Sequence, residues 1–335
     1  MTQENKFYQQ LDYLNKWKPA LDTKSVNQIV FSSLKSEISK REDEKIRVLD
    51  CGTGTGRGLV RLIEEGVLKK AEVEAFDISG ELISDMPRLF QEHAVKNRWE
   101  YKPVSYDQST DFMFTIQNDV KKIDVKIHGF QQSAYELPKR TELVQNIDVV
   151  TGQAFIEHVN QGIVYPILTM LLREGGLMYF SMNCDGWFNY SPSKDRERDE
   201  KMVALFNDLA LNNQEFKNDF GSIFGGEAFC GRNLPYRFKD YGIETLAFGS
   251  SDWVVAPFQQ SVEELSFLEY TSTYIRDKCV STPADEARNK RGLTSQDIYL
   301  WHAEKQKSLC DYTNNDQSIG FTCVQKDILG RKIRR

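Results

Sequence analysis

Residues 46–56 read Ile-Arg-Val-Leu-Asp-Cys-Gly-Thr-Gly-Thr-Gly, an apolar run that ends in an acidic residue and three alternating glycines. The apolar residues predict a strand over Arg47–Asp50. The glycines predict a tight turn in which a ligand can lie against bare backbone. A second apolar run, Val73–Phe76, ends at Asp77 about one βα unit later. In such units the carboxyl ends of the strands share one sheet edge, so we expect Asp77 beside the glycine turn.

The spacing of the glycines distinguishes between kinds of nucleoside-binding turn. The dinucleotide pattern G-x-G-x-x-G fails at its third glycine, because that position is Arg57. A P-loop would need Lys and then Ser or Thr after its last glycine, and the chain has no such run. A carboxylate at position 77 suits a ribose diol. The pattern therefore indicates an adenosine-bearing cofactor across the carboxyl ends of the first two strands, with an NAD-binding turn or a glycine loop without a ligand as the alternatives.

The run D-x-G-x-G-x-G over residues 50–56 resembles motif I of the class I S-adenosylmethionine (SAM)-dependent methyltransferases. The resemblance implies an enzyme of the small-molecule type, with SAM as cofactor and S-adenosylhomocysteine as product. In this interpretation Asp50 holds the SAM ammonium group and Asp77 accepts both ribose hydroxyls. The turn that packs against the amino-acid arm of SAM consists of Gly52, Thr53, Gly54 and Gly56.

Two later segments extend the resemblance. Residues 131–138 resemble the family's turn after the third strand, although Ser133 stands where the family has an acidic residue beside the adenine. The further residues expected to bind the cofactor are Ile78, Gln132, Ser133 and Ala134, with the Ser133 hydroxyl or the Gln132 amide at the adenine edge. Residues 152–158, Gly-Gln-Ala-Phe-Ile-Glu-His, resemble the motif IV region. There we expect Gln153 to contact the amino-acid arm.

Glu157 and His158 are the candidate catalytic residues, because this loop should face the cofactor. A histidine near neutral pH can accept a proton from a hydroxyl or an ammonium group. The alternative for His158 is a structural role, capping the next helix or packing on the sheet. Methyl transfer by direct displacement needs alignment and exclusion of water more than covalent help.

Alternating apolar strands and helices predict an α/β fold: a seven-stranded, mostly parallel Rossmann-like sheet with an antiparallel last strand over 320–326 at its edge. Residues 99–128 predict either an added hairpin or a split third strand. A Glu-Gly-Gly turn at 174–176 is expected to end a helix over 163–173. The domain prediction is an N-terminal helical lid (1–45), a SAM-binding core (46–182), a connecting or cap segment (183–242), and C-terminal strands (243–335) with a helical insertion at about 261–313.

The acceptor pocket is expected to form from the N-terminal helices and the later segments, which are rich in aromatic residues. Such side chains suit an apolar or aromatic small molecule and can stabilise a cation. A role in the core is the alternative for most of them. The aromatic residues in question are Tyr8, Tyr13, Trp17, Trp187, Phe188, Tyr190, Phe229, Tyr236, Trp253, Phe258, Phe267, Tyr270, Tyr274, Tyr299 and Trp301.

Composition narrows the partners. The 335 residues carry a net charge of −6, whereas nucleic-acid enzymes need a basic track for phosphates. The tail 331–335 is basic, but such short runs are mostly solvated surface. No apolar run suggests a membrane helix, and no signal peptide is evident, so a cytoplasmic protein is expected. Six scattered cysteines and four histidines show no metal-ligand or disulfide pattern, so no metal is expected.

The sequence thus predicts transfer of a methyl group to N or O of a small metabolite, with secondary metabolism as the expected setting. The oligomeric state is not predicted. Three alternatives stay open: a protein methyltransferase, an NAD-dependent oxidoreductase and a non-catalytic SAM-binding protein. DNA methyltransferases that modify amines usually carry N/D-P-P-Y/F after the fourth strand, whereas residues 152–155 here read Gly-Gln-Ala-Phe. The absence of that motif argues against a DNA methyltransferase of this kind.

Overall fold

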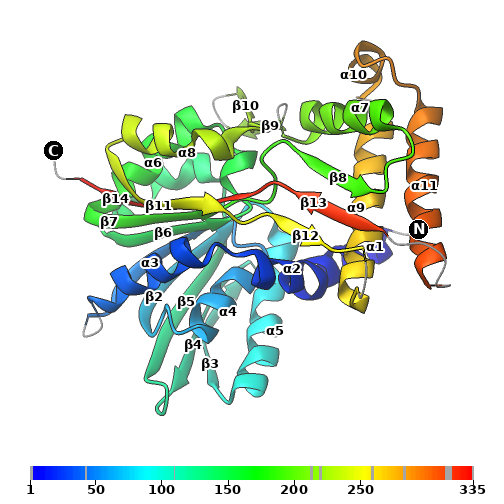
Figure 1. Cartoon of the computed structure of the whole chain (residues 1–335). Helices are drawn as coiled ribbons and strands as arrows, with labels where there is room; N and C mark the ends of the chain where they lie inside the picture. The colour runs from blue at the N-terminus through cyan, green and yellow to red at the C-terminus, as the bar shows by residue number, and fades with distance from the viewer. Residues whose placement is uncertain are drawn as a thin grey trace.

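The computed structural model describes residues 3–41, 44–108, 110–211, 214–218, 221–257, 260–281, 284–313 and 319–333. Phe258 and the last two residues of the basic tail lie outside these ranges. Figure 1 shows a large sheet with helices on both faces, and a second group of helices with a short sheet beside it. We call this second group the cap. No described helix is both long and apolar enough to cross a membrane.

The large sheet has nine strands in the order β11-β14-β7-β6-β1-β2-β5-β4-β3. Its strands are β1 (Ile46–Cys51), β2 (Lys70–Asp77), β3 (Glu100–Gln108), β4 (Asp111–Asn118), β5 (Ile123–Gln131), β6 (Ile147–Gln153), β7 (Leu172–Ser181), β11 (Ile243–Ser250) and β14 (Lys326–Lys332). The five central strands, β7, β6, β1, β2 and β5, are parallel, and β14 runs antiparallel to both its neighbours. The predicted mostly parallel sheet with an antiparallel last strand is therefore confirmed.

The two strands beyond the predicted seven come from the segment whose structure the sequence left open. Strands β3 and β4 form an antiparallel hairpin, and β4 continues antiparallel onto β5. Strand β5 is the third parallel strand, because it pairs in parallel with β2 along its whole length. The added hairpin is thus correct, and the split strand is wrong. The hairpin widens the sheet on the side away from the cap (Figure 1).

The predicted range and position of the last strand were wrong. Residues 320–323 form β13 in a separate three-stranded sheet with β8 (Phe188–Ser191) and β12 (Trp253–Val255). The strand of the large sheet begins at Lys326 and lies between β7 and β11, not at the edge. Ile328 and Leu329 are fully buried, so a two-sided interior position satisfies both their side chains and the backbone hydrogen bonds of β14.

The predicted helix end at the Glu-Gly-Gly turn was also wrong. Helix α6 (Gln161–Leu171) ends earlier, and Glu174 and Gly175 lie within β7. The register slips there, with Ile147 opposite Leu172 and Val149 opposite Leu177. Gly175 has φ +72°, which glycine adopts without strain. Leu171 and Leu172 are both fully buried, and this burial fixes where β7 begins. The residues between Leu172 and Leu177 that have no partner on β6 therefore form an irregularity within β7.

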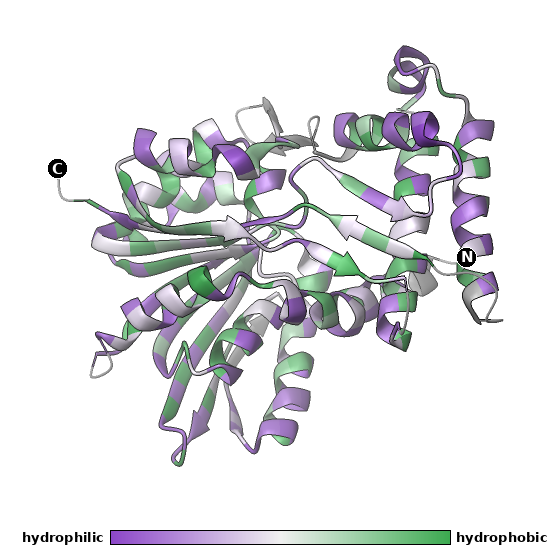
Figure 2. Cartoon of the chain, viewed as in Figure 1, coloured by the Kyte–Doolittle hydropathy of each residue, from purple (hydrophilic) through white to green (hydrophobic). Residues whose placement is uncertain are grey.

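Helices cover both faces of the sheet and give it two apolar cores. One face carries α3 (Gln28–Ser39), α4 (Arg57–Glu64) and α5 (Gly80–Asn97), and the other carries α6 and α8 (Cys230–Asp240). Helix α5 begins at the Ser79 side chain, which accepts a hydrogen bond from the Leu82 N–H. Figure 2 shows apolar residues through the strands and mixed apolar and hydrophilic residues along the helices, as a one-sided core requires.

The cap has an apolar core of its own. Its helical elements are α1 (Gln3–Asp12), η1 (Tyr13–Trp17), α2 (Lys18–Ser25), α7 (Arg196–Phe206), η5 (Asn207–Leu211), α9 (Val262–Val280), α10 (Asp285–Lys290) and α11 (Ser295–Thr313). The remaining described elements are η2 (Ala134–Lys139), η3 (Thr141–Leu143), η4 (Ile156–His158), β9 (Gln214–Asn218) and β10 (Gly221–Gly225). Helix α3, within the predicted lid, packs on β11 and β14 instead of on the cap. The domain boundaries stay a prediction.

Candidate active site

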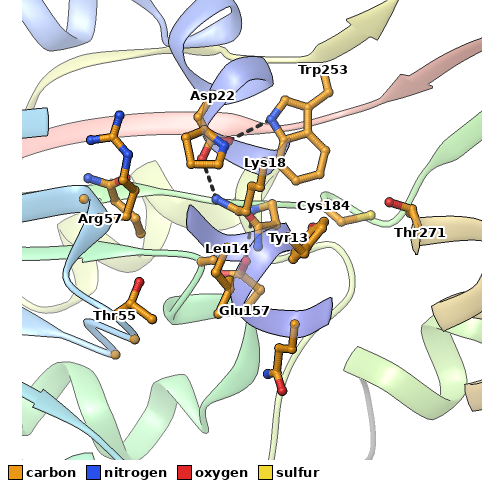
Figure 3. Close-up of a pocket in the computed structure, with 18 of the residues that line it drawn as sticks. Tyr13, Leu14, Lys18, Asp22, Thr55, Arg57, Glu157, Cys184, Trp253 and Thr271 are labelled. Atoms are coloured by element: carbon orange, nitrogen blue, oxygen red, sulfur yellow. Dashed lines mark hydrogen bonds and ion pairs between the residues drawn. The ribbon is translucent and has the colours of Figure 1, made fainter. Parts of the chain in front are cut away.

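A cavity of about 390 Å³ lies between the carboxyl ends of the parallel strands and the cap. Its volume is within the range of small-molecule pockets, about 300–1,000 Å³. One half is formed by the turns after β1, β2 and β6. The other half is formed by η1, α2, α9 and the small sheet (Figure 3). The predicted site residues in its wall are Asp50, Gly52, Thr53, Gly54, Asp77, Gln153, Glu157 and His158.

The glycine turn and the carboxylate after β2 are in direct contact. The Gly54 N–H donates to Asp77 Oδ2 at 2.7 Å, and the Ser79 N–H donates to Oδ1 at 2.8 Å. Burial raises the pKa of Asp77, and these two backbone donors act against that rise. A carboxylate has about four lone-pair sites, so Asp77 retains acceptor capacity for a ligand. The sequence prediction that the two elements meet is confirmed.

Asp50 is a buried carboxylate at the end of β1. The Thr151 hydroxyl donates a short hydrogen bond to its Oδ1 atom. Burial raises the pKa of Asp50 to about 6, while the Thr151 hydrogen bond opposes the rise. Its negative charge at neutral pH is therefore held at a cost in stability, which a cationic ligand group would offset.

Replacement of this carboxylate should stabilise the free protein in a pH-dependent way. Because the folded pKa lies above the unfolded value, ionised Asp50 disfavours folding above pH 6, and protonation removes the penalty below about pH 4. We expect Asp50→Asn to raise the free energy of unfolding by about 3 kcal/mol at pH 7.5, since the pKa of Asp50 rises from 3.8 to about 6 and one pKa unit corresponds to about 1.4 kcal/mol. Urea unfolding of both proteins should show that advantage shrinking toward pH 4. An advantage independent of pH would contradict it.

The last residue of β6, in the cavity wall, carries a side-chain donor without a partner in the described part of the chain. Gln153 Nε2 is buried and makes no hydrogen bond to the described residues. Its side chain lies against Gly58, where an added Cβ would come within 2.7 Å of Nε2. The next residue, Ala154, has φ +54°, an uncommon conformation for a residue with a side chain. Such backbone positions cluster at functional sites, and both residues line the cavity.

Gly54 differs from the other glycines of the turn. A Cβ at Gly54 would meet no protein atom within 4 Å, whereas one at Gly52 would come within 2.8 Å of Phe155. Gly56 immediately precedes α4, has φ +84° and packs against Met86 and Phe90, outside the cavity wall. The glycine at 56 is therefore explained by packing, and the turn is open to a ligand at Gly54.

The residues expected around the adenine lie next to the site without lining the cavity. The Gln132 N–H donates to the Asp77 backbone carbonyl, which joins the two turns. The Gln132 side chain accepts a hydrogen bond from Arg140 Nε at 3.0 Å, and Ser133 caps η2. Ala134 is a buried residue at the start of η2, and the Ile78 side chain is exposed. The adenine position stays a prediction.

Glu157 and His158 both line the cavity on η4 but differ in environment. Glu157 is fully buried, and its Oε1 accepts a hydrogen bond from the Asn183 N–H at 2.9 Å. Its Oε2 has no hydrogen-bond partner among the described residues. The His158 side chain is partly exposed, with Nε2 3.9 Å from Glu157 Oε1. The other histidines lie elsewhere: His93 and His128 contact partly buried carboxylates, and His302 contacts Thr273 in the cap.

Sequence reasoning missed a polar cluster in the N-terminal helices. Lys18 Nζ and Asp22 Oδ2 are 2.6 Å apart, and Trp253 Nε1 donates to Asp22 Oδ1 at 2.9 Å (Figure 3). A second link joins η1 to the glycine turn, because Thr55 Oγ1 donates to Asn15 Oδ1 at 2.5 Å. The feature of the sequence that could have indicated this ion pair is the i,i+4 spacing of Lys18 and Asp22 on a helix. Asn15 lies in η1, a π-helical turn of the kind often found at functional sites.

The aromatic residues divide between the cavity and the cores. The predicted residues that line the cavity are Tyr13, Phe188, Trp253, Tyr270 and Tyr274. Phe206 and Phe321 also line it and were not predicted. Tyr190, Phe267 and Trp301 are buried in the cap core, which agrees with the alternative of a packing role for these residues. Tyr8, Trp187, Phe229, Tyr236 and Tyr299 are exposed. Trp17 lies beside Tyr270, with ring centroids 6.0 Å apart.

No protein-family model and no curated protein matches the sequence. Among solved structures, the YcgJ protein of Bacillus subtilis is 14% identical with a TM-score of 0.44, covering 91% of this chain and 100% of that chain. A SAM-dependent methyltransferase from Methanosarcina mazei is 13% identical with a TM-score of 0.42, covering 87% and 94%. A geranyl diphosphate C-methyltransferase from Streptomyces coelicolor is 12% identical with a TM-score of 0.38, covering 90% and 77%. These are likenesses of fold alone.

Proposed function

We propose that this protein is a SAM-dependent methyltransferase that acts on N or O of a small, apolar or aromatic molecule. The observation that supports it best is the contact between Gly54 and Asp77 in the wall of the cavity. It places open backbone and a buried acceptor together, at the sheet edge where α/β proteins bind nucleosides. The acidic sequence without a basic track agrees with a small acceptor.

The polar groups of the cofactor half fit SAM. Asp77 offers acceptor sites for the ribose hydroxyls, and Asp50 offers a negative charge for the ammonium group. The unpaired Gln153 Nε2 offers a donor for the carboxylate of the amino-acid arm. Gly54 leaves room for that arm along the turn. When bound, SAM supplies an electrophilic methyl group on a sulfonium.

The residues of this chain would act mainly by position. The link between Thr55 and Asn15 holds η1 over the glycine turn, so the cap can exclude water from the cavity. The aromatic half would hold the acceptor in line with the sulfonium. His158, on the same wall, is the candidate base for an acceptor that must lose a proton. The cytoplasmic location and a role in secondary metabolism stay predictions.

Cofactor choice is the sharpest test of this proposal. In thermal unfolding experiments, we expect S-adenosylhomocysteine and SAM, each at 1 mM, to raise the melting temperature of the protein by about 3 °C or more, because only the folded state binds them. NAD at the same concentration should leave it unchanged, since the third glycine of its fingerprint is missing. A shift with NAD alone would favour the oxidoreductase. A shift with neither would remove the proposed function.

A further inference from the structure

The wall between the two halves of the cavity contains a carboxylate oxygen without a partner. Glu157 is fully buried, and its Oε1 is satisfied by the Asn183 N–H. Oε2 lies buried with no hydrogen-bond partner among the described residues. A buried carboxylate oxygen loses its hydration on folding, and an unmade hydrogen bond leaves that loss uncompensated. A ligand group that donates a hydrogen bond to Oε2 would compensate for the lost hydration.

The other carboxylates of the cavity wall already have partners. Asp22 is paired with Lys18 and accepts from Trp253. Asp50 accepts from a threonine hydroxyl, and Asp77 accepts from two backbone N–H groups. Among the described residues, no lysine or arginine forms an ion pair with Glu157. In the described part of the chain, the nitrogen within ion-pair distance of Glu157 is His158 Nε2, 3.9 Å from Oε1 and beyond hydrogen-bond length. No described lysine or arginine therefore compensates Glu157, and the unpartnered Oε2 points to a cationic ligand group.

Glu157 lies where the cofactor half meets the aromatic half. Cys323 Sγ donates to the Asn183 carbonyl at 3.3 Å, so Asn183 connects Glu157 to the small sheet of the cap. Cys323 lines the cavity together with Tyr13 and Tyr270, whose rings stack with centroids 4.4 Å apart. The negative faces of aromatic rings attract cations, and their area suits a carbon skeleton. A carboxylate that shares a cavity wall with such rings is a combination suited to an organic ammonium.

We propose that the methyl acceptor is a small organic amine, held as its ammonium by Glu157 Oε2 with its carbon skeleton on the rings of Tyr13 and Tyr270. This proposal rests on the proposed function, because it takes the space beside the glycine turn to be filled by the cofactor. A neutral hydroxyl could donate to Oε2 but would leave the buried charge uncompensated. Glu157 is thus a specificity-determining residue for the charge of the acceptor.

Three probes of matched size test the charge preference. We would titrate 2-phenylethylamine, 2-phenylethanol and phenylacetate into the full-length protein saturated with S-adenosylhomocysteine, by calorimetry at pH 7.5. The amine should bind at least tenfold more tightly than the alcohol, a difference of about 1.4 kcal/mol. Phenylacetate should bind more weakly than either. The same titrations on Glu157→Gln, which keeps the acceptor for the Asn183 N–H, should give dissociation constants for the amine and the alcohol that differ by less than threefold.

Glu227→Gln is the matched control. Glu227 is a neighbouring carboxylate outside the cavity wall, and it pairs with Asn233. This variant should keep the tenfold preference. Equal binding of amine and alcohol by the unaltered protein, survival of the preference in Glu157→Gln, or no binding of the amine would each overturn the proposal. Because S-adenosylhomocysteine binding is measured first, its failure would overturn the proposed function separately.

Discussion

Asp77→Ala should weaken S-adenosylhomocysteine binding by about 100-fold or more while the sheet stays folded. Two ribose hydroxyls would lose a charged acceptor, and a hydrogen bond to a charged group contributes about 1.5–3 kcal/mol. Two such bonds correspond to a factor of about 100 or more in the dissociation constant. The variant also leaves the N–H groups of Gly54 and Ser79 without their partner, so a lower melting temperature is expected. Titration calorimetry measures the affinity directly.

Glu72→Ala separates loss of the site from general damage to β2. Glu72 lies on the same strand, is partly exposed and is absent from the cavity wall. We expect its affinity for S-adenosylhomocysteine to match that of the unaltered protein within about twofold, because surface substitutions seldom exceed about 0.5 kcal/mol. Circular dichroism on both variants checks that the fold is kept. An unchanged affinity in Asp77→Ala would exclude this carboxylate from the cofactor site.

Trp301→Ala should destabilise the cap by about 3–5 kcal/mol, the usual effect of removing a buried tryptophan side chain. Trp301 is 1% exposed and packs edge-on against Tyr190, with ring centroids 5.7 Å apart. The buried ammonium group of Lys305 lies 5.7 Å from its ring centroid, so the variant also removes a cation–π contact. Urea unfolding followed by circular dichroism gives the change in the free energy of unfolding.

Trp187→Ala makes the same chemical change at a side chain that is 45% exposed, so it should cost less than about 1 kcal/mol. In native buffer we expect both tryptophan variants to bind S-adenosylhomocysteine within about threefold of the unaltered protein, because neither side chain lines the cavity. Equal destabilisation by the two variants would show that the cap core around Trp301 is packed less tightly than described.

Much of the sheet could be predicted because its signals are local. The apolar run before Asp77 and the glycines after Asp50 fix the end of β2 and the turn after β1. The last strand could not be placed in the same way. Residues 320–332 contain two short apolar runs, and only their partners show that 320–323 join β8 while 326–332 join β7. Strand pairing is a tertiary property that a single sequence expresses weakly.

In the candidate site, too, contacts between neighbouring strands could be predicted from the sequence, and contacts between distant segments could not. Asp77 and the glycine turn are in contact because both follow neighbouring parallel strands, which the sequence shows. The hydrogen bond between Trp253 and Asp22 joins residues 231 positions apart, and no local pattern predicts it. The unpaired oxygen of Glu157 is likewise a result of three-dimensional packing. Sequence reasoning could place Glu157 near the cofactor, but could not show that its described neighbours leave Oε2 without a hydrogen-bond partner.

The most direct measurement is a crystal structure of this protein with S-adenosylhomocysteine. We predict the two ribose hydroxyls within hydrogen-bond distance of the Asp77 carboxylate, the amino-acid arm along Gly54, and its carboxylate on Gln153 Nε2. The sulfur should face the cavity half lined by Tyr13 and Tyr270. A nucleoside bound elsewhere, or bound here with its ribose turned away from Asp77, would contradict the assignment of this sheet edge as the cofactor site.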